Sequence, residues 1–377
     1  MINYQVNWKY KPFLFIIDMI GNIVFFYKKL FKKRFKKEDI KKILIIRVDE
    51  IGDVIVTTPL ISTLKKEFPK SKLSVLVKES TVELLKNNPN IDGIYVTKSW
   101  FKEKISLGEF IELIKKFRKE NFDMVLDPHA DPRNIILAYF CGKIKIGFNI
   151  RGFGFLLDFV APYKKKHISE TILDLAKAVG IKKVNKKTEV YFSKKDEIKI
   201  NNLFKKHKIK RNKLLICINP GTGRKNKEWL LKNWQSLTGL LIKKYNCQII
   251  FTGNEEENKL IGKIIGKNKN CYNFSGKTNL LELSALIKKC DLFIAPDTGS
   301  LHIARALNVP LIGLFGPIDP KIWGYSERKY ISLYKKLDCS FCNMPNCIRK
   351  TEKNKCMAEI EVSDVLKRTD RLIGHLT

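Results

Sequence analysis

Residues 290–325 read CDLFIAPDTGSLHIARALNVPLIGLFGPIDPKIWGY, and this stretch decides the fold. Its pattern predicts a buried strand at Leu292–Ala295, a turn, a helix over Ser300–Leu307 and a second buried strand at Val309–Phe315. A strand, a tight turn, a helix and another strand in this order are typical of a parallel α/β unit.

The turn of this stretch has a chemistry of its own. Asp297, Thr298 and Gly299 precede the helix, and Ser300 and His302 lie in its first turn. A helix N-terminus presents unpaired N–H groups at the positive end of the helix dipole, and glycine lets an anion approach them. Asp297 could cap the helix or accept a hydrogen bond from a ribose hydroxyl. The turn suits a diphosphate with a sugar attached, and an ordinary capped helix is the alternative.

The same alternation of strand and helix recurs on both sides of a charged segment at 194–210, from Lys42 onward and again from Leu214 onward. The pattern therefore predicts an α/β protein of two Rossmann-like, doubly wound domains that face a cleft. We predict an N-terminal extension at 1–38, a first domain at 39–195, a second at 196–361 and a C-terminal helix at 362–377.

Local patterns give further expectations. The sequence predicts a helix at Thr81–Lys86, a short strand near Val190, a charged helix and linker over 194–210 that ends the first domain, and a closing helix at Val362–Ile373. In a doubly wound sheet, ligand sites lie beyond the carboxyl ends of the strands. Asp53, Asp127, His129 and Arg133 lie at such ends. For Asp53, pairing with the helix dipole alone is the alternative.

The composition limits the partners. The 377 residues carry a formal net charge of +34, which favours anionic partners such as nucleic acid, anionic lipid or a phosphorylated glycan. The lysines are spread along the chain, and no helix-turn-helix, zinc-finger or RNA-binding motif occurs, so we expect no nucleic acid partner. No secretory signal is evident, and the scattered cysteines suit a reducing compartment.

The N-terminal extension combines apolar and basic residues. Phe13–Tyr27 is apolar but shorter than the roughly 20 residues that span a membrane, and Lys28–Lys37 is basic with aromatic residues between the charges. This combination predicts a helix on the surface of an anionic membrane over residues 13–37. A helix packed on the first domain is the alternative.

Four cysteines near the C-terminus have the spacing C-x₂-C-x₄-C-x₈-C. They are Cys339, Cys342, Cys347 and Cys356. Four thiols so close together could hold a structural zinc ion, and plain surface thiols are the alternative.

Three segments together resemble the heptosyltransferase family, glycosyltransferase family 9. They are RVDEIGDVIVTTPLISTLKKEFP from Arg47, NPGTGRKNKEW from Asn219, and APDTGSLHIARALNVPLIGLFGPIDPKIWGY from Ala295. The resemblance covers about Ile40 to the C-terminus. It implies a GT-B glycosyltransferase that moves heptose from ADP-heptose onto the inner core of lipopolysaccharide, with inversion and without a catalytic metal.

The resemblance also assigns residues. It makes Asp53 the catalytic base and places the donor on residues of the second domain: Thr222, Gly223, Lys227, Glu255, Thr278, Asp297, Thr298, Gly299 and His302. Arg47, Asp127, His129 and Arg133 fall on the acceptor side. The implied partners are a nucleotide sugar and a lipid-linked glycan at the cytoplasmic face of the inner membrane. Another nucleotide sugar, a catalytically idle scaffold and a basic nucleic-acid-binding protein are the alternatives.

Overall fold

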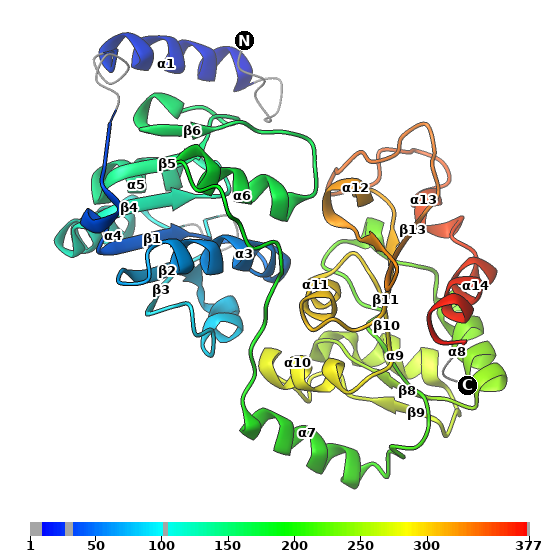
Figure 1. The fold of residues 1–377 in the computed structure, drawn as a ribbon. Coiled ribbons are helices and arrows are strands. Elements are labelled where there is room, and N and C mark those ends of the chain that lie inside the picture. Colours follow the sequence, from blue (N-terminus) through cyan, green and yellow to red (C-terminus); the bar gives the residue numbers. More distant parts are fainter. Residues whose placement is uncertain (1–9, 27–32, 101–104, 375–377) are drawn as a thin grey trace. The chain divides into compact units, whose positions relative to one another are not determined.

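The computed structural model describes residues 10–26, 33–100 and 105–374 (Figure 1). The chain divides into two compact units, Met1–Thr188 and Glu189–Thr377. Each unit is built on one largely parallel sheet with helices on both faces, which confirms the predicted α/β class with two doubly wound units. The N-terminal extension groups with the first unit and the C-terminal helix with the second, and the predicted limits at 38 and 361 stay predictions.

The sheet of the first unit has the strand order β3-β2-β1-β4-β5-β6, and all its neighbouring strands are parallel. The strands are β1 (Lys42–Ile46), β2 (Lys72–Lys78), β3 (Gly93–Thr97), β4 (Phe122–Asp127), β5 (Gly142–Phe148) and β6 (Phe159–Ala161). The helices are α1 (Lys11–Val24), α3 (Ile51–Glu67), α4 (Leu107–Glu120), α5 (Pro132–Cys141) and α6 (Ile168–Ala178), with 3₁₀ turns η2 (Lys37–Asp39), η3 (Glu79–Leu85) and η4 (Gly154–Leu156).

Strand β1 lies inside this sheet and is apolar on both faces. Leu44 and Ile46 share one core with Phe117 of α4 and Leu137 of α5. Side chains alternate along a strand, so the other residues of β1 point to the opposite face, on the side of α3 and α6, which pack together. A strand buried on both faces explains the continuous apolar run that precedes Arg47 in the sequence.

The sheet of the second unit has the order β12-β13-β11-β10-β7-β8-β9, and only β12 runs antiparallel to its neighbour. The strands are β7 (Leu215–Ile218), β8 (Gln248–Phe251), β9 (Cys271–Asn273), β10 (Leu292–Pro296), β11 (Leu311–Phe315), β12 (Ser326–Glu327) and β13 (Tyr330–Tyr334). The helices are α7 (Lys194–Lys206), α8 (Leu231–Tyr245), α9 (Asn258–Ile265), α10 (Leu280–Lys288), α11 (Gly299–Ala306), α12 (Pro320–Trp323), α13 (Lys355–Ala358) and α14 (Val362–Ile373), with 3₁₀ turns η5 (Lys225–Lys227) and η6 (Glu255–Glu257).

One face of this second sheet carries a single large core. Alternate residues of its central strands, such as Ile216 and Ile294, pack against Trp234 of α8, Ile261 of α9 and Val365 of α14. The closing helix α14 begins and ends where the sequence predicts, and its apolar side completes this core.

Three local predictions differ from the structure. The segment at 79–85 forms 3₁₀ turns instead of an α-helix. No strand forms near Val190, because the backbone there pairs with no strand of either sheet, although the Val190 side chain is buried. Helix α7 does not end the first unit. It packs on α10 of the second, where Lys199 pairs with Glu282 at 2.7 Å.

Helix α1 packs against the 3₁₀ turn η4 of the first unit. The 14 residues of α1 are fewer than a membrane crossing requires, and among the described residues we find no helix that is long and apolar enough to cross a bilayer. Part of the predicted membrane-surface segment, residues 27–32, lies outside the described residues.

Candidate functional site

Both sheets reverse their strand order at one point, and several of the predicted site residues follow the strands beside it. In the first unit the reversal lies between β1 and β4, and in the second between β7 and β10. In open α/β sheets, ligands bind beyond the carboxyl ends of the strands at such a reversal. The candidate site of each unit therefore lies at its own reversal.

Asp53 lies in the first turn of α3, shortly after β1, and Arg47 holds it. Arg47 Nη2 donates to Asp53 Oδ1 over 3.0 Å, and Arg47 Nε donates to the Asp53 backbone oxygen over 3.1 Å. The Arg47 side chain is 2% exposed, whereas a quarter of the Asp53 side chain is exposed. Arg47 is thus buried beside the predicted base and orients it, with little surface left for an acceptor.

Asp49, which the sequence alone did not indicate, links this pair to His129. Asp49 Oδ2 lies 3.2 Å from Arg47 Nη1, and Asp49 Oδ1 lies 2.8 Å from His129 Nδ1. Burial acts to raise the pKa of Asp49, but the Arg47 guanidinium and His129 outweigh it and lower that pKa below its ordinary value. Asp49 therefore stays ionised and neutralises Arg47.

The environment of Asp53 favours proton uptake. Burial raises the pKa of Asp53 above its ordinary value of 3.8, the Arg47 guanidinium opposes the shift, and the Asp49 carboxylate adds to it. A carboxylate with a raised pKa is a stronger proton acceptor than an ordinary aspartate. Asp53 therefore combines partial exposure, a fixed orientation and raised basicity.

His129 follows β4 and connects the Asp53 network to the loop after β5. Its Nε2 lies 2.9 Å from Nη1 of Arg151, a residue that the sequence alone did not indicate. Asp127 is fully buried, and its Oδ1 accepts hydrogen bonds from the backbone N–H of His129 (3.0 Å) and from Asn134 Nδ2 (2.9 Å). Burial raises the pKa of Asp127 to about 6. Asp127 shapes the loop that carries His129 and does not face solvent.

Arg133 is held by local contacts at the start of α5. Its guanidinium forms a bidentate salt bridge with Asp131 through two hydrogen bonds of 2.8 Å. It also donates a hydrogen bond of 2.8 Å to the backbone oxygen of Trp100. The side chain is 35% exposed. Arg133 could contact an acceptor only through the part of its surface that these bonds leave open.

In the second unit, Lys227 and Asp297 bring two distant segments together. Lys227 ends the 3₁₀ turn η5, and Asp297 follows β10. Lys227 Nζ lies 2.5 Å from Asp297 Oδ2 and 3.3 Å from the Asp297 backbone oxygen. Both side chains are mostly buried, with 16% and 9% exposed. A cation held so close to a helix N-terminus is suited to receive phosphate oxygens.

His302 lies on the same helix start and has a defined partner. Its Nδ1 lies 2.6 Å from the hydroxyl oxygen of Tyr325, and its Nε2 lies 3.9 Å from Asp297 Oδ1. Burial raises the pKa of Tyr325, so the phenol keeps its proton and can donate it to Nδ1. That donation would place the imidazole proton on Nε2, on the side of Asp297.

The remaining donor-side residues form two small turns. Thr298 Oγ1 lies 2.9 Å from Ser300 Oγ, and Gly299 begins α11. Thr222 Oγ1 donates to the Arg224 backbone oxygen over 2.8 Å, which closes the turn around Gly223. A β-carbon added at Gly223 would meet no atom within 4 Å, so open space lies beside this turn.

The carboxylate of Glu257 lies at the carboxyl ends of β7 and β8 in the second sheet. Its carboxylate occupies the space beside Gly221, which follows β7, and Gly253, which follows β8, where a β-carbon at either glycine would overlap it. Glu257 Oε2 accepts a hydrogen bond from the Asn254 N–H over 2.9 Å, and burial raises the Glu257 pKa. Two glycines without side chains thus make room for one half-buried carboxylate.

The predicted donor residues Glu255 and Thr278 lie farther along the same loops. Glu255 is exposed, and its β-carbon lies 3.3 Å from where a β-carbon at Gly276 would be. Thr278 is half-buried and precedes Asn279, which caps α10. Of the two glutamates, Glu257 is the one with a half-buried, oriented carboxylate.

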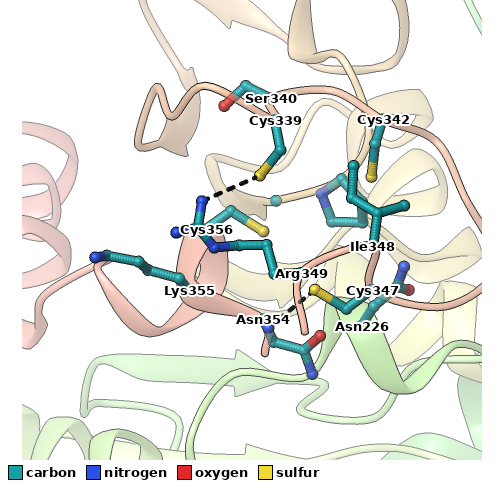
Figure 2. Close-up of a pocket in the computed structure, with 12 residues that line it drawn as sticks. Asn226, Cys339, Ser340, Cys342, Cys347, Ile348, Arg349, Asn354, Lys355 and Cys356 are labelled. Atoms are coloured by element: carbon teal, nitrogen blue, oxygen red, sulfur yellow. Dashed lines mark hydrogen bonds between the residues drawn. The ribbon is translucent and has the colours of Figure 1, made fainter. Parts of the chain in front are cut away.

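The four clustered cysteines line one small cavity (Figure 2). The cavity has a volume of about 10 Å³, which is room for roughly one water-sized body. Cys347 Sγ accepts a hydrogen bond from the Asn354 N–H over 3.3 Å, and Arg349 Nη1 lies 3.8 Å from Cys339 Sγ. Burial raises the pKa of Cys356 to about 11. Within the described ranges, no three His, Cys, Asp or Glu side chains are already grouped as metal ligands.

Four residues of these networks were not predicted from the sequence, and only two of them had a signal there. Asp49 stands between Arg47 and Asp53, and Tyr325 ends the stretch that contains His302. Glu257 is one of three consecutive glutamates, among which the sequence alone cannot choose, and Arg151 lies in a segment without a regular pattern.

Comparison with known proteins gives a family match. The model of "Glycosyltransferase family 9 (heptosyltransferase)" matches residues 110–357. The lipopolysaccharide core heptosyltransferase OpsX of Haemophilus influenzae is 26% identical over 352 residues, which cover 88% of this chain and 97% of that protein. These matches confirm the resemblance that the three sequence segments indicated.

Solved structures share the fold. A glycosyltransferase family 9 protein from Veillonella parvula aligns with a TM-score of 0.76 and 21% identity, over 90% of this chain and 99% of the other. E. coli heptosyltransferase WaaC, solved with ADP-2-deoxy-2-fluoro heptose, aligns with a TM-score of 0.66 and 18% identity, over 87% and 99%. At this identity the likeness concerns the fold.

Proposed function

This chain belongs to glycosyltransferase family 9, and on that premise we propose that it transfers heptose from ADP-heptose to an inner-core lipopolysaccharide or related glycan acceptor, with inversion at the sugar carbon. The observation that carries the proposal is the pairing of Lys227 with the Asp297 turn, beside His302 and the start of α11. The lysine and the N–H donors beside it suit a nucleoside diphosphate.

The donor would bind through the second unit. Lys227 and the N–H groups that follow Thr298 would hold the diphosphate, and Thr222 and Gly223 would close over it from the loop after β7. Glu257, with its half-buried carboxylate, would accept hydrogen bonds from the ribose hydroxyls. Thr278 would border the nucleoside, whereas the exposed side chain of Glu255 would lie outside the donor contacts.

The acceptor would be activated by Asp53 in the first unit. As the acceptor hydroxyl attacks the anomeric carbon, it loses a proton, and the Asp53 carboxylate would take it. Arg47 and Asp49 would fix the orientation of Asp53, while His129, Arg151 and the open part of Arg133 would contact the acceptor. Asp127 would act indirectly, through the loop that it holds.

Negative charge grows on the diphosphate as the sugar leaves. Lys227, the N–H groups at the start of α11 and His302, with its proton on Nε2, would stabilise that charge. These groups are part of the chain, so we propose that transfer requires no catalytic metal.

The position of Glu257 leads to a prediction that separates it from Glu255. We expect Glu257→Gln to weaken ADP-sugar binding about fivefold, the scale of one hydrogen bond of about 1 kcal/mol, because the amide keeps the bond to Asn254 N–H but is a weaker acceptor for ribose hydroxyls. Glu255→Gln is the matched control and should bind the donor normally in titration calorimetry. Equal affinity for both variants would remove Glu257 from the donor site.

The cysteine cavity leads to a second prediction. We propose that Cys339, Cys342, Cys347 and Cys356 converge on one structural zinc ion, with the N–H of Asn354 supporting a sulfur ligand. We expect one zinc per chain by elemental analysis, and its loss in Cys339→Ser/Cys356→Ser but not in the control Cys271→Ser. Chelation should then unfold the second unit slowly and reduce activity, without rescue by Mg²⁺. Purified protein that contains no zinc, even when expressed with zinc present, would contradict the proposal.

The proposed acceptor is linked to a lipid, so we further propose that the enzyme acts at the cytoplasmic face of the inner membrane, with residues 13–37 against the lipid. The support is the apolar and basic composition of this segment.

A panel of nucleotide sugars tests the proposed function directly. ADP-heptose should raise the unfolding temperature of the purified protein more than UDP-, GDP- or CMP-sugars do, because a ligand stabilises the state that binds it. With a lipopolysaccharide core acceptor, mass spectrometry should then detect addition of one heptose. Stabilisation by a different nucleotide sugar would identify that sugar as the donor instead of ADP-heptose. No response to any of them would favour a protein that keeps the fold without catalysing transfer.

A further inference from the structure

Helix α1 buries only three residues against the protein and leaves most of its large apolar residues exposed. The buried residues of α1 are Leu14, Asp18 and Gly21. The helix also exposes seven large apolar residues, namely Phe13, Phe15, Ile16, Met19, Ile20, Ile23 and Val24, each about 50–70% exposed. A helix at a protein surface normally has the opposite arrangement. A continuous apolar surface of this kind marks an interaction site.

The buried side of α1 is fitted to the first unit in detail. Asp18 Oδ1 accepts a hydrogen bond of 2.7 Å from the N–H of Phe153, whose φ is +65°. At Gly21 a β-carbon would overlap the ring of Phe155, so only glycine allows this ring to lie against the helix. Phe25, just after the helix, packs its ring against Phe155 at 5.5 Å between centroids. These contacts fix which side of α1 faces outward.

The charge around α1 indicates what covers its outer side. Residues 1–37 contain nine Lys and Arg residues and one acidic residue, Asp18, which is buried against the loop. Of the basic residues, Lys33 pairs with Asp158 and Lys37 with Glu67. A second copy of the chain would bring two such basic segments together, whereas an anionic bilayer offers both an apolar layer and negative charge.

We infer that α1 is a preformed membrane-binding surface that lies flat on an anionic bilayer, with Ile16, Ile20 and Ile23 inserted among the lipids. The helix needs no refolding for this contact, because the buried side chain of Asp18 already sets its rotation. Basic residues near the bilayer are attracted to its anionic headgroups, which strengthens the apolar contact.

The same loop connects this surface to the acceptor-side residues. Gly152, against which Leu14 packs, and Phe153 directly follow Arg151, whose Nη1 lies 2.9 Å from His129 Nε2. A bilayer in contact with α1 would therefore lie one loop away from the residues proposed to bind the acceptor. The lipid contact is inferred from the helix alone, and only its use for capturing a lipid-linked acceptor rests on the proposed function.

Vesicle sedimentation with the full chain tests the inference. We expect the protein to bind vesicles of phosphatidylglycerol and phosphatidylethanolamine and to bind phosphatidylcholine vesicles much less. Ile16→Ser/Ile20→Ser/Ile23→Ser should weaken binding to the anionic vesicles more than about tenfold, because three inserted side chains are lost. The matched control Leu107→Ser/Ile198→Ser/Leu240→Ser removes exposed apolar residues from other helices and should bind like the wild type.

Both variants should keep the wild-type unfolding temperature, which separates lost binding from lost folding. Failure of the wild type to sediment, or equal binding by the α1 variant, would overturn the inference. A wild-type dimer that the α1 variant converts to a monomer would show that the surface joins two copies instead. The assay contains neither donor nor acceptor, so its result and the result of the transfer assay are independent.

Discussion

Replacing Asp53 with asparagine should lower the turnover number by about two to four orders of magnitude, the usual scale of general-base catalysis. The amide has the same shape as the carboxylate, so its oxygen can still accept the hydrogen bond from Arg47 Nη2. It cannot take a proton from the acceptor hydroxyl. The substitution therefore removes the proposed chemistry while the buried arginine keeps a partner.

The pH dependence gives a second measure of the same residue. The carboxylate is the active form of the proposed base, and burial raises its pKa above 3.8, so protonation begins at a higher pH than for an ordinary aspartate. Wild-type turnover should fall as the pH decreases through this raised pKa. In Asp53→Asn the residual rate should lack this acidic limb.

Steady-state transfer assays from pH 4 to 9, on the order of one point per half unit, would measure both effects. Glu112→Gln makes the same change of charge on the exposed surface of α4 and should leave turnover unchanged. Because the donor residues lie in the second unit, Asp53→Asn should also bind ADP-heptose normally. Turnover within a few fold of the wild type would exclude Asp53 as the base.

The fold could be predicted from the sequence because its signals are local and repeated. Apolar runs such as Ile43–Ile46 and Leu292–Ala295 end at turn residues and are followed by helices, which fixes the class of each unit. The prediction of a strand near Val190 was wrong because it rested on a local apolar pattern alone. Val190 is buried, but a strand also requires a neighbouring edge to pair with, and no local pattern encodes that neighbour.

The site was predictable by residue type and not by role. Arg47 and Asp127 are where the sequence places them, yet both are buried and hold other groups instead of facing solvent. The choice between Glu255 and Glu257 depends on Gly221, which lies more than 30 residues earlier and leaves space for only one of the carboxylates. Roles of this kind depend on contacts between segments that are distant in the sequence. The spacing of residues along the chain does not predict such contacts.

Replacing Lys227 with alanine should weaken ADP-heptose binding by about 1.5–3 kcal/mol, or roughly 10- to 150-fold, the scale of a hydrogen bond between charged groups. Lys227 Nζ lies 2.5 Å from Asp297 Oδ2. A diphosphate would compete for this cation at the start of α11, where N–H groups also point toward it. Without Lys227, the phosphate charge would also approach the mostly buried carboxylate of Asp297 with no cation between them.

Lys225→Ala provides a matched control, because Lys225 belongs to the same 3₁₀ turn but is exposed. Titration calorimetry with ADP-heptose should give wild-type affinity for Lys225→Ala and the full loss for Lys227→Ala. The substitution also leaves Asp297 without its lysine partner, which lowers the stability of the protein. Thermal unfolding without ligand must therefore show that the Lys227→Ala protein is folded at the titration temperature. Equal losses in both variants would mean that the positive charge of the loop acts as a whole, and unchanged affinity in Lys227→Ala would remove this lysine from the diphosphate site.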